Sequence, residues 1–108
     1  MVRQHAFEVI EDPNFKESNF SQADNLRVIF KANVNFLLNC KNIPVRTFFR
    51  SLNNAGVSIT MNAWIYSQRT SPPSFLLVVT FARILGVTPS QLLDPKLPEY
   101  YHDIEPTK

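Results

Sequence analysis

The most constraining feature of the sequence is a short segment, Phe75–Leu85, that is apolar almost all the way round. A helix of this composition has no polar face to turn toward water, so it must lie at the centre of a domain. Its ends are also marked, because Ser71 is expected to cap it, two prolines follow that cap, and Gly86 ends it. We therefore expect a central helix here, with the other elements arranged around it.

Four further helices are predicted around the central one. Apolar residues at intervals of three or four define the first, and a threonine–proline cap with glutamine three residues on starts the last. No convincing pair of strands interrupts these segments, so the expected fold class is all-α, a compact five-helix bundle. The four segments run from near Ser21 to Asn42, from Ile43-Pro44 through Leu52, from Ser58 or Thr60 to about Ser67, and from Thr88 to Leu93.

The apolar faces of these helices predict the core. Aromatic residues at helical spacing are expected to pack inside rather than to stack on bases. Cys40 is expected to pack at the end of the first helix. The residues expected inside are Leu26, Phe30, Val34, Phe36, Leu37, Phe48, Phe49, Leu52, Trp64, Phe75 and Phe81.

Both ends of the chain look peripheral. We expect residues 1–20 to be an N-terminal extension, residues 21–94 to be the folded domain, and residues 95–108 to be an acidic tail. Three prolines in that tail disfavour a long regular element. The tails also contain aromatic and aliphatic residues, so at least one is expected to pack on the domain or on a second subunit.

The charges divide the chain into three regions. Residues 1–24 have a net charge of −3 and residues 94–108 have a net charge of −2, whereas residues 25–93 contain seven basic residues and no acidic one. A region that excludes every carboxylate and keeps its arginines is suited to a negatively charged partner. The simpler alternative is a solvated basic face that arose by chance.

Several classes of protein are disfavoured. No apolar run approaches the roughly 20 residues of a membrane helix, and the N-terminus lacks the apolar core of a signal peptide. The single cysteine favours a reducing compartment, so we expect a cytoplasmic protein, associated with the nucleoid if bacterial. His5, His102 and Cys40 have no metal-ligand spacing. We expect no enzyme, no metal, no cofactor and no small-molecule substrate.

Three stretches carry a resemblance to a known family. They are Ala82-Arg-Ile-Leu-Gly-Val-Thr-Pro-Ser-Gln-Leu-Leu93, Thr70-Ser-Pro-Pro-Ser-Phe75 and Leu37-Leu-Asn-Cys-Lys-Asn-Ile-Pro44. Together they resemble the phage-repressor type of helix-turn-helix domain, the lambda repressor and Cro-like family, over about residues 26–94. The segment 53–59 departs from that pattern, because it lengthens the turn before the third helix.

The resemblance implies sequence-specific binding of double-stranded DNA by a transcriptional regulator, repressor-like, that acts as a homodimer. The third helix would enter the major groove while the second spans the backbone. We prefer Thr60 as the cap of the third helix, since it makes Trp64 a buried residue, but Ser58 remains an alternative. The candidate DNA-binding residues are Arg46, Thr47, Arg50, Ser58, Thr60, Met61, Asn62, Tyr66, Gln68 and Arg69. The alternative function is a protein-binding adapter or antitoxin that uses the same helical core.

Overall fold

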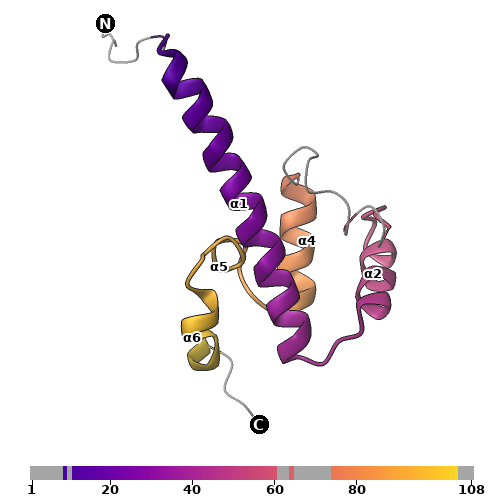
Figure 1. Ribbon diagram of the computed structural model, residues 1–108. Coiled ribbons are helices and arrows are strands. Elements are labelled where there is room, and N and C mark those ends of the chain that lie inside the picture. Colours follow the sequence, from indigo (N-terminus) through magenta and orange to yellow (C-terminus); the bar gives the residue numbers. More distant parts are fainter. Residues whose placement is uncertain (1–8, 10, 61–63, 65–73, 105–108) are drawn as a thin grey trace, which may run out of the picture.

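The part of the chain that the structure describes is all-α, as expected. The structure is a computed structural model, and it describes residues 9, 11–60, 64 and 74–104. No strand occurs in these residues, and none of their helices is both long and apolar enough to span a membrane. The helices are α1 (Pro13–Cys40), α2 (Val45–Asn54), α4 (Phe75–Leu85), α5 (Pro89–Leu92) and α6 (Leu97–Ile104) (Figure 1).

The predicted central helix is confirmed as α4. It lies between α1 and α2 in Figure 1 and contacts α1, α2 and α5. Its cap is Ser74, whose hydroxyl accepts the N–H of Leu77 at 3.2 Å, so the expectation of a cap at Ser71 is wrong. Ser74 is one residue before Phe75, where a side-chain oxygen can reach the free N–H groups of the first turn. The left-handed Gly86 ends the helix, as predicted.

An aromatic cluster joins the helices around Phe81, which is fully buried. Its ring centroid lies 5.2 Å from that of Phe30 on α1, 5.0 Å from that of Phe48 on α2 and 5.2 Å from that of Trp64. Trp64 is 6% exposed, which confirms its predicted place in the core. The contacts have the tilted and edge-to-face geometries that aromatic pairs prefer.

Helices α1, α2 and α4 each end at a residue with positive φ. These residues are Asn42 (55°), Gly56 (94°) and Gly86 (77°). After each of them the next N–H donates to a carbonyl five residues back, at 2.9–3.0 Å. This pattern satisfies carbonyls that a helix end would otherwise leave open. The predicted stops at Asn42 and Gly86 are confirmed.

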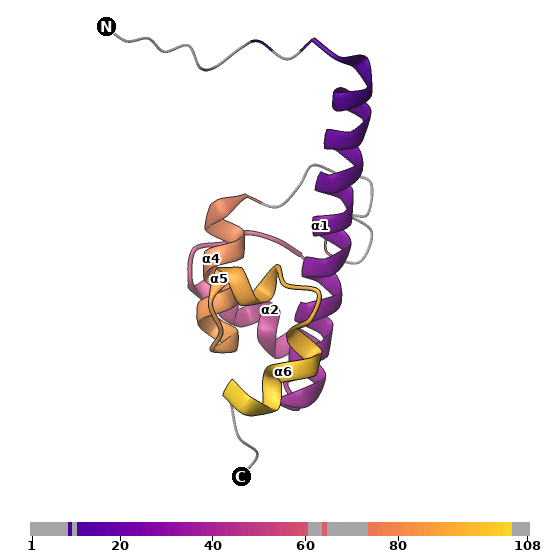
Figure 2. The ribbon, with the colours of Figure 1, turned by 90° about the vertical axis from the view of Figure 1, so that its left-hand side faces the viewer.

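The first helix is longer than expected. It begins at Pro13 rather than near Ser21, because Asp12 accepts the N–H of Asn14 at 2.9 Å and Pro13 takes the first helical position. It has 28 residues, its N-terminal part projects beyond the other elements, as Figures 1 and 2 show, and the molecule measures 54 × 32 × 27 Å. Part of the expected N-terminal extension is therefore helical.

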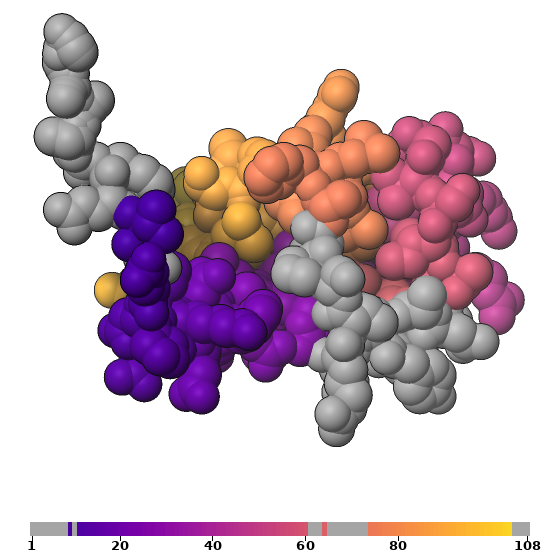
Figure 3. Space-filling model, turned by 90° about the horizontal axis from the view of Figure 1, so that it is seen from above, coloured from indigo at the N-terminus to yellow at the C-terminus, as the bar shows by residue number. Residues whose placement is uncertain are grey.

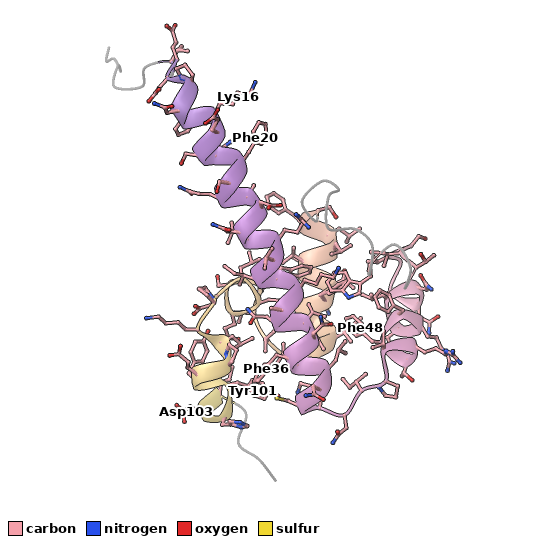
Figure 4. All side chains as sticks on the ribbon, viewed as in Figure 1. Lys16, Phe20, Phe36, Phe48, Tyr101 and Asp103 are labelled. Atoms are coloured by element: carbon pink, nitrogen blue, oxygen red, sulfur yellow. The ribbon has the colours of Figure 1, made fainter. Side chains whose placement is uncertain are left out.

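The C-terminal tail contains a packed helix, α6. Leu97 is fully buried and Tyr101 is 4% exposed. The ring of Tyr101 meets that of Phe36 on α1 edge-on, 5.7 Å between centroids (Figure 4). The expectation that one tail packs on the domain is confirmed, whereas the prolines do not exclude a helix. Pro98 lies in the first turn, where a missing N–H removes no helical bond.

Asp94 connects α5 to α6. Its carboxylate accepts the backbone N–H of Lys96 at 2.9 Å and the hydroxyl of Tyr100 at 2.9 Å. These two hydrogen bonds, first that of Lys96, hold the pKa of Asp94 below its usual range. Burial and the bond to Asp94 raise the pKa of Tyr100.

Three residues expected inside lie at the surface. Phe75 is 91% exposed and Leu26 is 47% exposed, because both lie beside a groove between α1 and α4 rather than in the core. Cys40 is exposed at the end of α1. Phe36 is partly buried against the core. The predicted core residues that the structure confirms as buried are Phe30, Val34, Leu37, Phe48, Phe49, Leu52, Trp64 and Phe81.

A buried amide, Asn33, fixes α1 to the end of α5. It is 3% exposed, and its Nδ2 donates to the carbonyls of Leu92 at 2.9 Å and Asp94 at 2.8 Å. The last carbonyls of a helix have no partner within the helix, so this amide supplies the donors. A buried polar group costs little only when it is paired in this way.

Asn33→Asp tests this connection. The substitution keeps the shape but places a carboxylate oxygen against two carbonyl oxygens, which should cost about 3 kcal/mol of stability at neutral pH. Burial raises the folded-state pKa of the new carboxyl, so the loss should be small at low pH and grow as pH rises above about 4. Urea unfolding at several pH values measures it.

Asn35→Asp is the matched control, because Asn35 is exposed on the same helix. It should leave the unfolding free energy nearly unchanged. An equal loss of unfolding free energy in the two variants would contradict the role given to Asn33.

Candidate nucleic-acid interface

Helix α2 has one apolar side and one polar, basic side. Its buried residues are Phe48, Phe49 and Leu52. Arg46 and Arg50 lie one turn apart on the exposed side, and Thr47 is exposed beside them. The structure therefore brings together three of the predicted site residues on one helix. We call Arg46, Thr47 and Arg50 the α2 basic face.

The N-terminus of α2 adds hydrogen-bond donors to this face. Pro44 is its N-cap and has no side-chain oxygen to accept the N–H groups of the first turn. The first helical bond runs from the N–H of Phe48 to the carbonyl of Pro44, at 3.0 Å. The N–H groups before Phe48 point along the helix axis toward solvent, an arrangement that favours an anion. The sequence itself indicates this uncapped N-terminus, because neither Ile43 nor Pro44 has a side chain that could cap the helix.

Three of the basic residues that the structure describes between positions 25 and 93 have contacts within the molecule. Arg27 forms an ion pair with Asp24. The Nζ of Lys31 lies 5.3 Å from the centre of a Trp64 ring, and burial together with the charge of Arg27 lowers the pKa of Lys31. The Nζ of Lys41 lies 5.8 Å from the centre of the Tyr101 ring. These cations stabilise the fold.

The arginines of the α2 basic face differ from those cations. Within the described chain, neither Arg46 nor Arg50 forms an ion pair with a carboxylate, and Arg83 on α4 resembles them in this respect. Because residues 25–93 contain no acidic residue, no neighbour in sequence competes for their charge. The guanidinium groups of Arg46 and Arg50 are therefore available to an external anion.

The segment after α2 is held in place by its helix end. Gly56 donates to the carbonyl of Asn53 at 3.1 Å, and Val57, 6% exposed, donates to that of Leu52 at 2.9 Å. Trp64 N–H then donates to the carbonyl of Thr60 at 3.0 Å, a helical bond that fits a cap at Thr60. Residues 55–60 belong to no helix.

The remaining site residues divide into two groups. Ser58 and Thr60 are exposed on the segment that follows Gly56. The other five, Met61, Asn62, Tyr66, Gln68 and Arg69, lie outside the described residues. Among the described residues, no group of three or more potential ligands could hold a metal ion.

No family model, curated protein or solved structure matches this chain.

Gly56→Ala tests the turn that positions the segment after α2. Nothing lies within 4 Å of an added Cβ, so the cost comes from φ of +94° alone. We expect a loss of about 1 kcal/mol in the unfolding free energy, measured with urea.

Gly56→Asn is the control, since asparagine tolerates the left-handed region better than alanine. It should be the more stable of the two variants. An alanine variant as stable as the parent chain would show that the turn does not require this conformation.

Proposed function

We propose that this protein binds double-stranded DNA and regulates transcription, with the α2 basic face on the phosphate backbone. The observation that carries the proposal is the α2 basic face itself: two exposed arginines one turn apart, at the open N-terminus of a helix. Arginine side chains and helix N-termini are the usual phosphate ligands of DNA-binding proteins. Because residues 25–93 contain no carboxylate, none of their side chains repels the DNA phosphates.

We assign recognition of the DNA base sequence to the segment that follows α2. The buried Trp64 and the bond from its N–H to Thr60 support a helix that starts at Thr60. With that start, Asn62 is near the N-terminal end of the helix, where base-reading side chains of helix-turn-helix proteins concentrate. The resemblance to the phage-repressor type of domain supports the same assignment, with binding as a dimer at a near-palindromic site.

The phosphate contacts are tested by Arg46→Ala and Arg50→Ala. Each change removes one phosphate contact per subunit, so it should weaken binding to all duplexes alike and flatten the plot of log affinity against log salt by about 0.9 for each subunit bound. Fluorescence anisotropy with two unrelated duplexes measures both effects. Arg69→Ala should act in the same way.

Arg83→Ala is the matched control, because it removes the same charge from an exposed position on α4. Its slope of log affinity against log salt should stay closer to that of the parent chain. If all of these variants behaved like the parent, the α2 basic face would not be the phosphate site.

Asn62→Ala tests the base contact. An asparagine amide pairs with two atoms of an adenine edge, which is worth about 1–3 kcal/mol of discrimination. The variant should keep its non-specific affinity and lose preference at one base pair of each half-site, as selection from random duplexes would reveal. An unfolded variant whose remaining folded fraction keeps its preference would instead favour Ser58 as the cap.

A protein-binding adapter or antitoxin remains the second candidate, favoured by an apolar groove between α1 and α4. The salt dependence separates the two functions. A DNA-binding protein loses affinity for mixed-sequence duplex steeply as salt rises. An adapter would show little retention on DNA and a flat response.

A further inference from the structure

The N-terminal part of α1 is an exposed helical arm. We define the arm as residues 11–24, and every side chain from residue 11 to residue 22 is exposed. Figures 1 and 2 show it projecting past the start of α4. Two of its side chains are phenylalanines, Phe15 at 48% and Phe20 at 64% exposure. Figure 4 shows Phe20 pointing away from α1, beyond the level at which α4 begins.

An apolar groove of about 360 Å³ lies directly below the arm. Ala23, Leu26 and Arg27 of α1 form one wall. Phe75 and Val79 of α4 are on the other, and both are exposed, at 91% and 42%. Figure 3 looks down on this end of the molecule and shows α1 and the start of α4 at the same surface.

The arm and the groove form one continuous surface. At 100° per residue, Phe15, Phe20 and Ala23 project within about 80° of Phe30, which faces the core. Phe15 and Phe20 lie about 140° apart, on either side of the direction of Phe30, and Ala23 lies between them. The two phenylalanines therefore flank the face that packs α1 on the domain, and their own chain supplies no partner for them among the described residues. Large exposed apolar patches of this kind mark interaction sites.

We propose that this surface binds a second copy of the same chain, with the arm of each copy seated in the groove of the other. The proposal gives an interface to the dimer of the proposed function, although the interface itself needs no DNA, and three features favour a second copy over another partner. They are the area of the surface, its charge and its geometry.

The area fits a stable dimer. The exposed fractions of Phe15, Phe20 and Phe75 amount to about 400 Å² at roughly 200 Å² per aromatic side chain. A standard interface buries about 800 Å² per partner, of which a little over half is apolar. The three rings together with Leu26 and Val79 thus supply the apolar share that one partner needs.

The charges are complementary between arm and body. The arm has Glu11, Asp12, Glu17 and Asp24 against the single Lys16, a net charge of −3, whereas residues 25–93 have no acidic residue. An acidic arm is repelled by DNA phosphates and attracted by a basic body. Each copy supplies both halves of this pair, as a two-fold interface requires.

The geometry predicts an antiparallel arrangement. If the two-fold axis passes near residue 21, Phe15 of one copy reaches the level of Leu26 and Arg27 in the groove of the other. An α-helix rises 1.5 Å per residue, so Cys40 lies about 28 Å from the axis. The two Cys40 residues of the dimer would then be about 57 Å apart.

Sedimentation tests the interface without DNA. The full chain should be a dimer, and the double variant Phe15→Gln/Phe20→Gln should raise the dissociation constant about tenfold or more. Val28→Gln is the control, because Val28 is 57% exposed on the other side of α1. An unchanged melting temperature measured on dilute, monomeric protein establishes that the double variant is folded.

Two further measurements test the arrangement. Val79→Glu should weaken the dimer more than Val79→Lys, because a carboxylate in the groove repels the acidic arm. Spin labels on the native Cys40, which is exposed and is the only cysteine, should give a distance of about 57 Å.

A monomeric parent chain would overturn the proposal. The groove would then bind residues 1–8 or an unrelated partner in place of a second copy. A dimer that the double variant leaves intact, or one with a label distance below about 40 Å, would also overturn it. A monomeric parent chain would also remove the dimer and its two half-sites from the proposed function. The loss of DNA affinity with rising salt depends on phosphate contacts and would remain, so DNA binding and the arm interface fail separately.

Discussion

The packing of three aromatic rings against Phe81 is the interaction on which the rest of the structure depends. Phe81 stands on the helix that the composition forces to the centre, and its neighbours come from α1, from α2 and from Trp64. Because Phe48 is one of these neighbours, the cluster fixes which side of α2 is buried. The opposite side, with Arg46 and Arg50, is consequently presented to solvent. The candidate interface is thus a consequence of core packing.

Much of this fold could be predicted from local signals. Apolar composition identified α4, and left-handed residues identified the ends of α1 and α4. The start of α1 expected from the sequence is too late, although Asp12-Pro13 has the same cap-and-proline pattern as Thr88-Pro89. The reason is that Phe15 and Phe20 are five residues apart, without the three- or four-residue spacing that marks a helical face. Helix α6 is not predicted from the sequence because Pro98 resembles a helix breaker, whereas a proline is tolerated in a first turn.

Long-range contacts could not be predicted in the same way. Asn33 looks like any polar residue of a helix until the carbonyls of Leu92 and Asp94 meet it, about 60 positions later in the chain. The exposure of Phe75 likewise depends on a groove between two helices, which no local pattern encodes. For the candidate interface, the sequence predicted the polar side of α2 correctly. The assignments that fall on residues 61–63 and 65–73 lie outside the described residues and stay predictions.

The separation of charge along the chain allows a direct test of the central claim, that the basic side of α2 binds DNA and the acidic arm does not. The account assigns the basic side of α2 to DNA and the acidic arm to a second subunit. Titration of the isotopically labelled protein with duplex DNA, followed by amide NMR at moderate salt, tests the first assignment directly. We expect shifts concentrated at residues 45–50 and 56–60, with residues 13–22 unchanged. Shifts concentrated on the arm, with α2 unaffected, would contradict it.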